Sequence, residues 1–241
     1  MDIILKYFPD ITERQKEQFA ALLPLYEEWN AQINVISRKD MENFYEHHVL
    51  HSLAIAKVIQ FAPMTEVLDV GTGAGFPGLA LLIAQPDLQV TLLDSTKKKL
   101  TVIDDILQRL SLSATLLHSR AEDAAHNAAF RERFDIVTSR AVAPMVLLAE
   151  YCLPFVRPGG TLIAMKSGAV AQELDDAREA VQILGGAQPA IQKMQLDAVG
   201  ERSLVLIQKR SATNQKYPRP SAKIAKEPLT KKKTPSKSRK S

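Results

Sequence analysis

Cysteine is almost absent from this sequence: Cys152 is the only one, so no disulfide can form within the chain. The sequence also lacks an apolar run of the roughly 18 residues that a membrane-spanning helix needs. The first residues, Met1-Asp2-Ile3-Ile4, do not show the basic segment followed by an apolar stretch that marks a secretory signal. These absences exclude a disulfide-stabilised or membrane-spanning protein and predict a protein of the reducing cytoplasm.

Acidic residues are scarce only at the end of the chain. The 241 residues include 31 Lys/Arg and 27 Asp/Glu, a net charge of +4. Residues 210–241 contain 11 of the basic residues and one acid, Glu227, which leaves 20 basic and 26 acidic residues, a net charge of −6, for the rest. The low-complexity segment 230–240 is expected to be disordered, as a solubilising tail or as a weak contact to RNA phosphates.

From residue 64 onward, patterns typical of strands and helices alternate, which predicts a parallel sheet with helices on both faces. The expected strands are 66–70, 89–94, 114–117, 134–139 and 160–166, followed by an antiparallel hairpin of 187–195 and 202–209. The expected helices are 77–85, 96–110, 123–131, 145–156 and 170–184. We therefore expect a helical cap at 1–62, an α/β domain at 63–210 and a basic, disordered tail at 211–241.

The cap should contain two main helices. Asp10 or Thr12 can cap the first, and Pro24 should kink it or restart it. Asp40 can cap the second.

The sequence between the first two expected strands contains a glycine-rich turn, Asp69-Val70-Gly71-Thr72-Gly73-Ala74-Gly75, followed by Phe76-Pro77. Its spacing fits neither a dinucleotide fingerprint nor a P-loop, which needs a lysine. The next strand ends in Asp94, where a carboxylate can accept both hydroxyls of a ribose. The alternative is a turn that only connects strand to helix. An acid before the glycines and another after the next strand resemble class I S-adenosylmethionine-dependent methyltransferases.

Because ligands bind at the carboxyl ends of parallel strands, the strand ends supply further candidates. Strand three is followed by Ser119-Arg120-Ala121-Glu122, strand four ends at Arg140 and strand five at Lys166. Two cations beside a cationic sulfonium would suit an anionic substrate such as a nucleic-acid backbone. Alternatively, Arg140 pairs with Asp69 or the cofactor carboxylate, and Lys166 is a solvated strand end.

Some kinds of catalysis have no residues to carry them. The Asp/Asn/Ser-Pro-Pro-Tyr/Phe motif of amino-directed nucleic-acid methyltransferases is missing after strand four, and Cys152 lies in an expected helix core. His47 and His51 share a helix face, but the acid precedes the pair and no third ligand is near, so no metal site is expected. We expect one histidine to face the active site instead.

Several stretches together resemble the bacterial small-subunit ribosomal RNA guanine-N7 methyltransferases, once called glucose-inhibited division protein B. The most specific are the glycine loop followed at once by Phe76-Pro77-Gly78 and Ser139-Arg140-Ala141 after strand four. The resemblance covers about residues 10–229. It also includes Asn30, Asn34, His48, Lys166 and the stretch Tyr217-Pro218-Arg219.

The resemblance implies a seven-stranded, mostly parallel class I methyltransferase sheet with an antiparallel last strand. It implies methyl transfer from S-adenosylmethionine to N7 of guanine 527 in the 530 loop of 16S rRNA, by direct attack without a general base. The implied cofactor residues are Asp69, Gly71, Gly73, Gly75, Phe76, Asp94, Ser95, Ala121, Glu122 and Arg140. The implied catalytic residues are Arg140, Lys166, His48 and Asn34. The implied RNA-binding residues are Arg38, Lys166, Lys209 and Arg219.

The expected partner is the small ribosomal subunit, and the protein is expected to be a monomer. Two alternatives stay open: a methyltransferase acting on a small molecule or protein, and a non-catalytic RNA-binding assembly factor.

Overall fold

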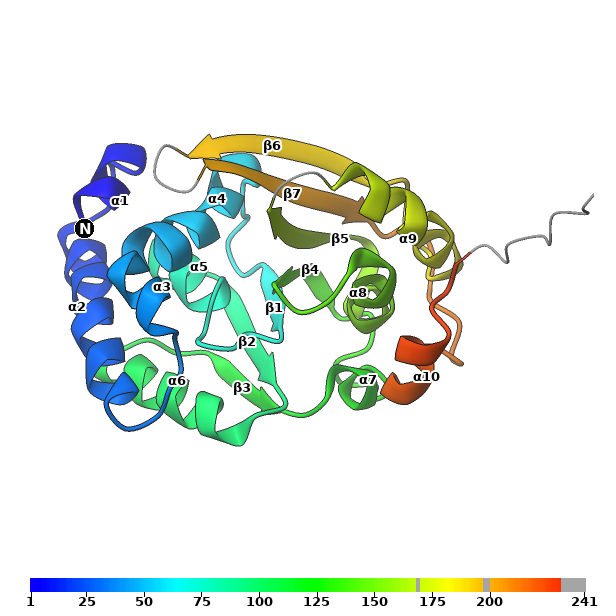
Figure 1. Ribbon diagram of the computed structural model, residues 1–241, viewed down its shortest axis with the longest axis horizontal. Coiled ribbons are helices and arrows are strands. Elements are labelled where there is room, and N and C mark those ends of the chain that lie inside the picture. Colours follow the sequence, from blue (N-terminus) through cyan, green and yellow to red (C-terminus); the bar gives the residue numbers. More distant parts are fainter. Residues whose placement is uncertain (168–169, 197–199, 231–241) are drawn as a thin grey trace, which may run out of the picture.

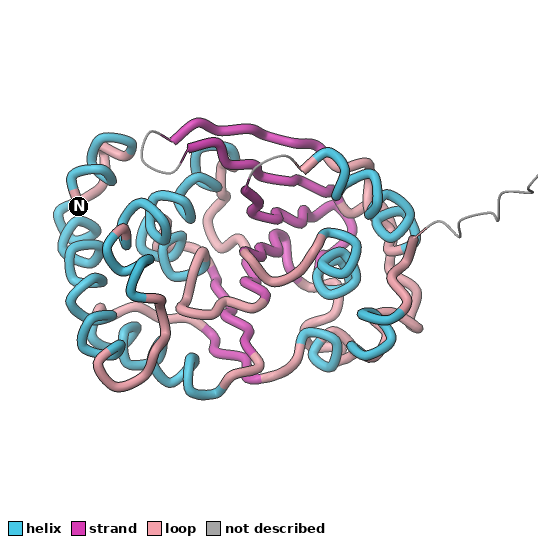
Figure 2. The backbone as a smooth tube through the Cα atoms, in the orientation of Figure 1, coloured by secondary structure: helices cyan, strands magenta, loops and turns pink. Residues whose placement is uncertain are grey.

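A sheet of seven strands runs through the middle of the described chain, with helices on both of its faces (Figures 1 and 2). The computed structural model describes residues 1–167, 170–196 and 200–230. The strands are β1 (Glu66–Val70), β2 (Gln89–Asp94), β3 (Thr115–His118), β4 (Phe134–Arg140), β5 (Val156–Ser167), β6 (Ala190–Leu196) and β7 (Gly200–Gln208). Their spatial order is β3-β2-β1-β4-β5-β7-β6, and β7 runs antiparallel to both of its neighbours. The predicted sheet is therefore confirmed, with β1 and β2 at their predicted bounds.

Alternate residues of each strand face opposite sides of the sheet, so the sheet separates two apolar cores. Val67 and Leu92 pack into one core, whereas their neighbours Leu68 and Leu93 pack into the other. The first core is covered by α1 (Asp2–Tyr7), α2 (Glu13–Asn30), the π-helix η1 (Tyr45–Leu50), α4 (His51–Val58), α5 (Gly78–Ala84) and α6 (Lys97–Arg109). The second is covered by α7 (Ala121–Ala124), α8 (Met145–Cys152), η2 (Leu153–Phe155) and α9 (Ala171–Ile183), on the right of Figure 1.

Helix α2 continues through Pro24, where the sequence predicts a kink or a restart. Proline lacks an N–H, so the carbonyl of Ala20, four residues earlier, loses its helical partner. The hydroxyl of Tyr45 lies 3.2 Å from that carbonyl oxygen and donates to it. A side chain from another helix thus replaces the missing bond. Thr12 caps α2, as one of the two predicted candidates.

The N-terminal helices do not pack as a separate layer, because Phe19, Tyr26 and Leu53 belong to the same core as Phe76 and Leu79 of the glycine-loop region. The predicted cap at 1–62 completes one face of the sheet, and its independence as a domain stays a prediction.

The prediction that Asp40 begins a helix is corrected. Short helix α3 (Arg38–Glu42) begins after Ser37, whose hydroxyl accepts from the backbone N–H of Asp40.

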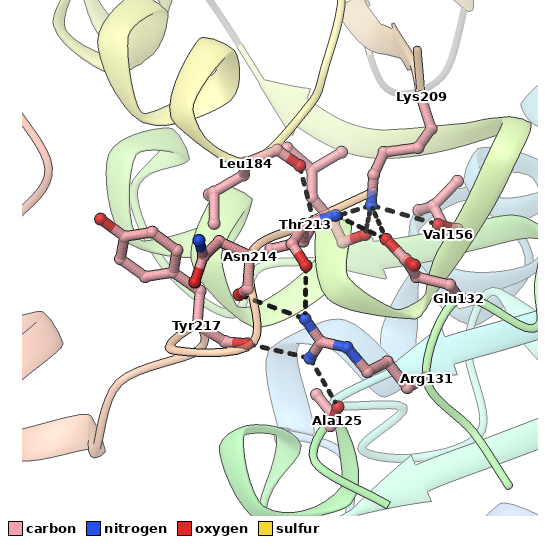
Figure 3. Close-up of polar contacts among 10 residues, drawn as sticks. Ala125, Arg131, Glu132, Val156, Leu184, Lys209, Thr213, Asn214 and Tyr217 are labelled. Atoms are coloured by element: carbon pink, nitrogen blue, oxygen red, sulfur yellow. Dashed lines mark hydrogen bonds and ion pairs between the residues drawn. The ribbon is translucent and has the colours of Figure 1, made fainter. Parts of the chain in front are cut away.

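Over residues 211–230, where the sequence predicts a disordered tail, the segment after β7 is ordered and packs against the turn after α7 and against α8. Arg131 donates to the carbonyls of Thr213 and Tyr217 at 2.8 and 2.9 Å (Figure 3). This anchor leads into α10 (Ser221–Lys226), which packs against α8. The prediction for 231–241 lies outside the described residues.

The predicted helix 123–131 is also corrected. Only α7 forms, and Arg131 follows it in a turn that positions its guanidinium for this anchor. No helix in the described part of the chain is long and apolar enough to cross a membrane.

Candidate active site

Two adjoining pockets open at the carboxyl ends of β1, β2 and β4. The first, called the strand-end pocket, has a volume of about 420 Å³. Its lining residues are Val70, Gly71, Leu93, Asp94, Ser95, Ser119, Arg120, Ala121, Glu122, Val142, Ala143, Pro144, Leu147 and Tyr151. The second, called the helix-side pocket, has a volume of about 720 Å³. Its lining residues are Val35, Ile36, Ser37, Asp40, His47, His48, His51, Gly71, Thr72, Gly73, Ala74, Phe76, Asp94, Ser95, Thr96, Lys99, Arg140, Ala141, Val142 and Arg202.

The two pockets share a wall made by Gly71, Asp94, Ser95 and Val142. Gly71 has a φ of +69°, and a Cβ on it would lie 2.6 Å from a methyl carbon of Val142. Only glycine therefore suits this position, both for its backbone conformation and for the space available. The loop after β4 carries Val142 and packs directly against the glycine turn.

Asp94 holds the glycine turn in place as well as facing both pockets. One of its carboxylate oxygens accepts from the backbone N–H of Gly73 at 2.9 Å, and the other accepts from that of Thr96 at 2.8 Å. On the other side of the turn, the buried hydroxyl of Tyr26 donates to the carbonyl of Ala74. The sequence predicted Asp94 for the site, but the role of Tyr26 depends on a helix far away in the chain.

Asp69 does not line either pocket, so its predicted cofactor contact is corrected. Its side chain is fully buried, and one oxygen accepts from the Thr72 hydroxyl at 2.7 Å and from the Gly78 N–H at 2.9 Å. Burial raises the pKa of Asp69 to about 6, although these hydrogen bonds oppose the shift. Because strand residues alternate, Asp69 faces the same side as Val67, toward α5, whose first N–H it occupies. Asp69 therefore stabilises the glycine turn from the side that faces α5, away from the two pockets.

Gly75 also faces away from the pockets. Its φ is +89°. A Cβ built on Gly75 would lie 3.4 Å from the Cβ of Leu79 and 3.4 Å from the hydroxyl of Tyr26. Of the three glycines predicted to approach a cofactor, the structure thus places Gly71 and Gly73 at the pockets and Gly75 in the core contact with α2 and α5.

Arg140 lies in the helix-side pocket among aromatic rings. Its guanidinium donates to the carbonyl of His47 and to Nδ1 of His48, both at 2.8 Å, and lies 5.7 Å from the ring centre of Phe76. The predicted pair with Asp69 does not form within the described residues, and the predicted contacts with the cofactor carboxylate or an anionic substrate stay predictions. Burial and the nearby Arg140 charge lower the pKa of His48 to about 4 and that of His51 to about 3. Both rings are therefore neutral near pH 7.

Lys166 is not a free cation at a strand end. Its ammonium donates to the carboxylate of Glu173 at 2.6 Å and to the carbonyl of Ala143 at 2.8 Å, and 14% of its side chain is exposed. Glu173 also accepts from the N–H of Met145. The pair thus fixes the loop after β4, which lines the strand-end pocket, and its predicted contact with RNA is corrected to a structural one.

Lys209 and Arg219 are likewise committed inside the protein. The Lys209 side chain is fully buried, and its ammonium donates to carbonyls of Leu153 and Val156 and pairs with Glu132 at 3.1 Å (Figure 3). Arg219 forms a two-bond pair with the fully buried carboxylate of Glu150. Both cations are neutralised by carboxylates inside the protein, so both predicted RNA contacts are corrected to structural ones.

The remaining predicted residues divide between pocket and surface. Ser95, Ala121 and Glu122 line the strand-end pocket, and Phe76 and His48 line the helix-side pocket. Asn34 and Arg38 are exposed and line neither. Tyr151, Val142 and Arg202 also line the pockets, although nothing in their local sequence signals a pocket.

Lys99 also lines the helix-side pocket, and its position at the start of α6, shortly after Asp94, could have indicated this from the sequence.

Among the described residues, no three or more His, Cys, Asp or Glu side chains come together in a way that could hold a metal ion.

Comparison with solved structures defines the class of protein. The chain is similar to a protein from Corynebacterium glutamicum with a TM-score of 0.51 at 17% identity, over 87% of this chain and 95% of that one. It is similar to an O-methyltransferase family protein from Burkholderia thailandensis with a TM-score of 0.51 at 15% identity, over 67% of this chain and 56% of that one. Together with the sheet order and the strand-end pocket, this identifies a class I methyltransferase fold.

Sequence comparison then identifies the particular family. The model of the family described as rRNA small subunit methyltransferase G (GidB) matches residues 15–205. Curated proteins called ribosomal RNA small subunit methyltransferase G are similar over most of their length. The one from Bacteroides thetaiotaomicron is 49% identical over 72% of this chain and 84% of its own. The one from Lachnoclostridium phytofermentans is 42% identical over 93% of both. The chain belongs to this family and is a methyltransferase.

Proposed function

We propose that the protein transfers a methyl group from S-adenosylmethionine to N7 of a guanine in the 530 loop of 16S rRNA, guanine 527 in the family. The observation that carries this proposal is the shared wall of the two pockets at Gly71 and Asp94. A nucleoside bound in the strand-end pocket and a base bound in the helix-side pocket would meet there. The names of the relatives supply the RNA substrate, and a cytoplasmic location follows from it.

The residues of the strand-end pocket suit the adenosine part of the cofactor. Asp94 is placed at the end of β2 to accept from ribose hydroxyls, and Glu122 and Ala121 border the far side of the pocket. Leu147 and Tyr151 provide an apolar wall for the adenine ring. When bound, S-adenosylmethionine supplies an electrophilic methyl group on a cationic sulfur. A Cβ on Gly71 would lie 2.6 Å from Val142, so a side chain there would push apart the wall that this ligand would contact.

Guanine N7 suits a site without a strong base, because it carries a lone pair and no proton that must leave. The histidines of the helix-side pocket have pKa values of about 4 and about 3, so they are weak proton acceptors. The contribution of the protein is then to hold the base in line with the methyl group, and good orientation of two reactants is worth up to about 7–11 kcal/mol. We assign this positioning role to Arg140, which lines the helix-side pocket and lies against the buried ring of Phe76.

The experiment is transfer of labelled methyl groups from S-adenosylmethionine to 30S subunits from cells that lack this gene, with wild-type subunits as the control. Label in 7-methylguanosine of the 530 loop, on the unmodified subunits only, is the expected result. Cofactor binding without transfer to any RNA would contradict the proposal and favour a small-molecule methyltransferase or an assembly factor.

A further inference from the structure

The exposed basic side chains of the protein fall into two groups according to whether a carboxylate neutralises them. Arg133 and Arg157, for example, lie at the amino ends of strands and pair with Glu66 and Asp135 at 2.7 and 2.6 Å. Others have no ion pair within the described residues, and six of these, exposed or half-buried, we call the basic rim. They are Arg38, Lys39, Lys97, Lys98, Lys99 and Arg202. The others that lack a pair within the described residues line neither pocket, and they are Arg14, Lys57, Arg210, Lys216, Lys223 and Lys226.

The basic rim surrounds the mouth of the helix-side pocket. Lys99 and Arg202 line that pocket directly. Arg38 and Lys39 are exposed and lie between two of its lining residues, Ser37 and Asp40, and Lys97 and Lys98 lie between Thr96 and Lys99. The rim thus comes from three elements, α3, α6 and β7, that converge on one opening. The body of the protein is acidic overall, so this local positive field is an exception to its average charge.

The three lysines of the rim in α6 are unfavourably placed for the stability of that helix. The amino end of a helix carries a partial positive charge and favours acidic residues in its first turn. The first turn of α6 contains Lys97, Lys98 and Lys99 and no acid, and Thr96 provides no side-chain cap. Asp94, the nearest carboxylate, is shared between the N–H groups of Gly73 and Thr96. Local rules that a natural sequence breaks without compensation point to a functional site.

We propose that the basic rim binds phosphates of the RNA strand on either side of the target nucleotide, while the base itself enters the helix-side pocket. Phosphate contacts position a nucleic acid without reading its sequence, which suits lysines that pair with no carboxylate among the described residues. This proposal rests on the proposed function, because it takes RNA as the methyl acceptor. In this proposal the basic rim, and not Lys166, Lys209 or Arg219, supplies the contacts to the RNA backbone.

The test compares two variants that remove the same charge. K97Q/K98Q removes two rim cations without touching either pocket lining, and R133Q/R157Q removes two paired cations at the amino ends of the strands, opposite the pockets. Binding of unmodified 16S rRNA, free and in 30S subunits, is measured between 50 and 200 mM salt. Methyl transfer is measured on the same samples. Each lost phosphate contact lowers the slope of log affinity against log salt by about 0.7–0.9, so wild type should lose about tenfold more affinity than K97Q/K98Q over this range.

The expected result is a lower salt slope and a raised KM for K97Q/K98Q, with kcat and cofactor affinity unchanged, and wild-type behaviour for R133Q/R157Q. Equal salt slopes in wild type and K97Q/K98Q would overturn the proposal, as would equal losses in both variants. RNA binding that depends on the rim but leads to no methyl transfer would support RNA binding by the rim and overturn the proposed function. Absence of RNA binding by the wild type would overturn the proposed role of the rim.

Discussion

Replacing Arg219 by methionine removes the charged partner of a fully buried carboxylate. Glu150 lies in α8 with none of its surface exposed, and Arg219 donates to it from Nε at 2.9 Å and from Nη2 at 2.7 Å. The backbone N–H of Arg219 donates to the same carboxylate at 2.8 Å and would remain after the substitution. Methionine keeps the apolar part of the side chain, so the change isolates the loss of the guanidinium.

The expected cost follows from the burial of the pair. Breaking a buried ion pair by removing one partner costs about 3–5 kcal/mol, because an uncompensated charge stays behind. We expect R219M to lower the free energy of unfolding by about 3 kcal/mol, the lower end, since 14% of the arginine side chain is exposed and some water can reach the carboxylate. The assay is urea denaturation followed by circular dichroism.

A double-mutant cycle supplies the control. Replacing Glu150 and Arg219 together by methionine should recover most of the loss, because a buried pair replaced by apolar groups is often close to neutral. The exposed pair of Arg133 and Glu66 should contribute at most about 1 kcal/mol in the same assay. Unchanged stability of R219M together with weaker RNA binding would refute this reasoning and restore Arg219 as an RNA contact.

Three further predictions concern the pocket walls and the buried histidines. Y26F should lower stability by about 1–3 kcal/mol and weaken cofactor binding, measured by calorimetry, because the Ala74 carbonyl loses its buried donor. D94N should weaken cofactor binding by about 10–100-fold in the same assay, since hydrogen bonds to charged groups are worth about 1.5–3 kcal/mol. His48 and His51 have folded pKa values below the ordinary 6.5, so the unfolded state binds more protons and stability falls as pH falls below 6.5. Each of these histidines should lower the free energy of unfolding by about 2 kcal/mol when the pH falls to about 5. The variant H48Q/H51Q should lose this part of the pH dependence, measured by denaturation curves at about pH 7.5 and 5.

The controls differ for each of these changes. Tyr45 also donates a hydroxyl to backbone carbonyls of α2 but does not touch the glycine turn, so Y45F should lower stability and leave cofactor affinity unchanged. Cofactor affinity of D94N equal to wild type would contradict the role of Asp94. Asp69, with its pKa raised by burial to about 6, opposes the histidines between pH 4 and 6, but it is common to wild type and variant and cancels in their difference. Parallel pH curves for wild type and H48Q/H51Q would contradict the third prediction.

The sequence by itself determined the elements whose signals are local. Apolar runs bounded by turn residues locate β1 and β2 at their observed bounds, because a strand buried on both faces depends mainly on its own apolar run. The glycines at 71 and 73 and the carboxylate at Asp94 follow from spacing along the continuous stretch that forms β1, the glycine turn, α5 and β2. The family also followed from short motifs, since its specific residues lie close together along the chain.

Only the tertiary structure decided which charged residues are free to meet a ligand. A lysine or arginine looks the same in sequence whether it is solvated or paired, and its partner is often far away in the chain. Lys209 bonds to Leu153, Arg219 pairs with Glu150 and Tyr26 holds Ala74, each more than 40 residues apart. Burial makes such partners obligatory, because an unpaired buried charge is costly. In the part of the chain that the structure describes, the same packing leaves Lys97, Lys98 and Lys99 without an ion-pair partner.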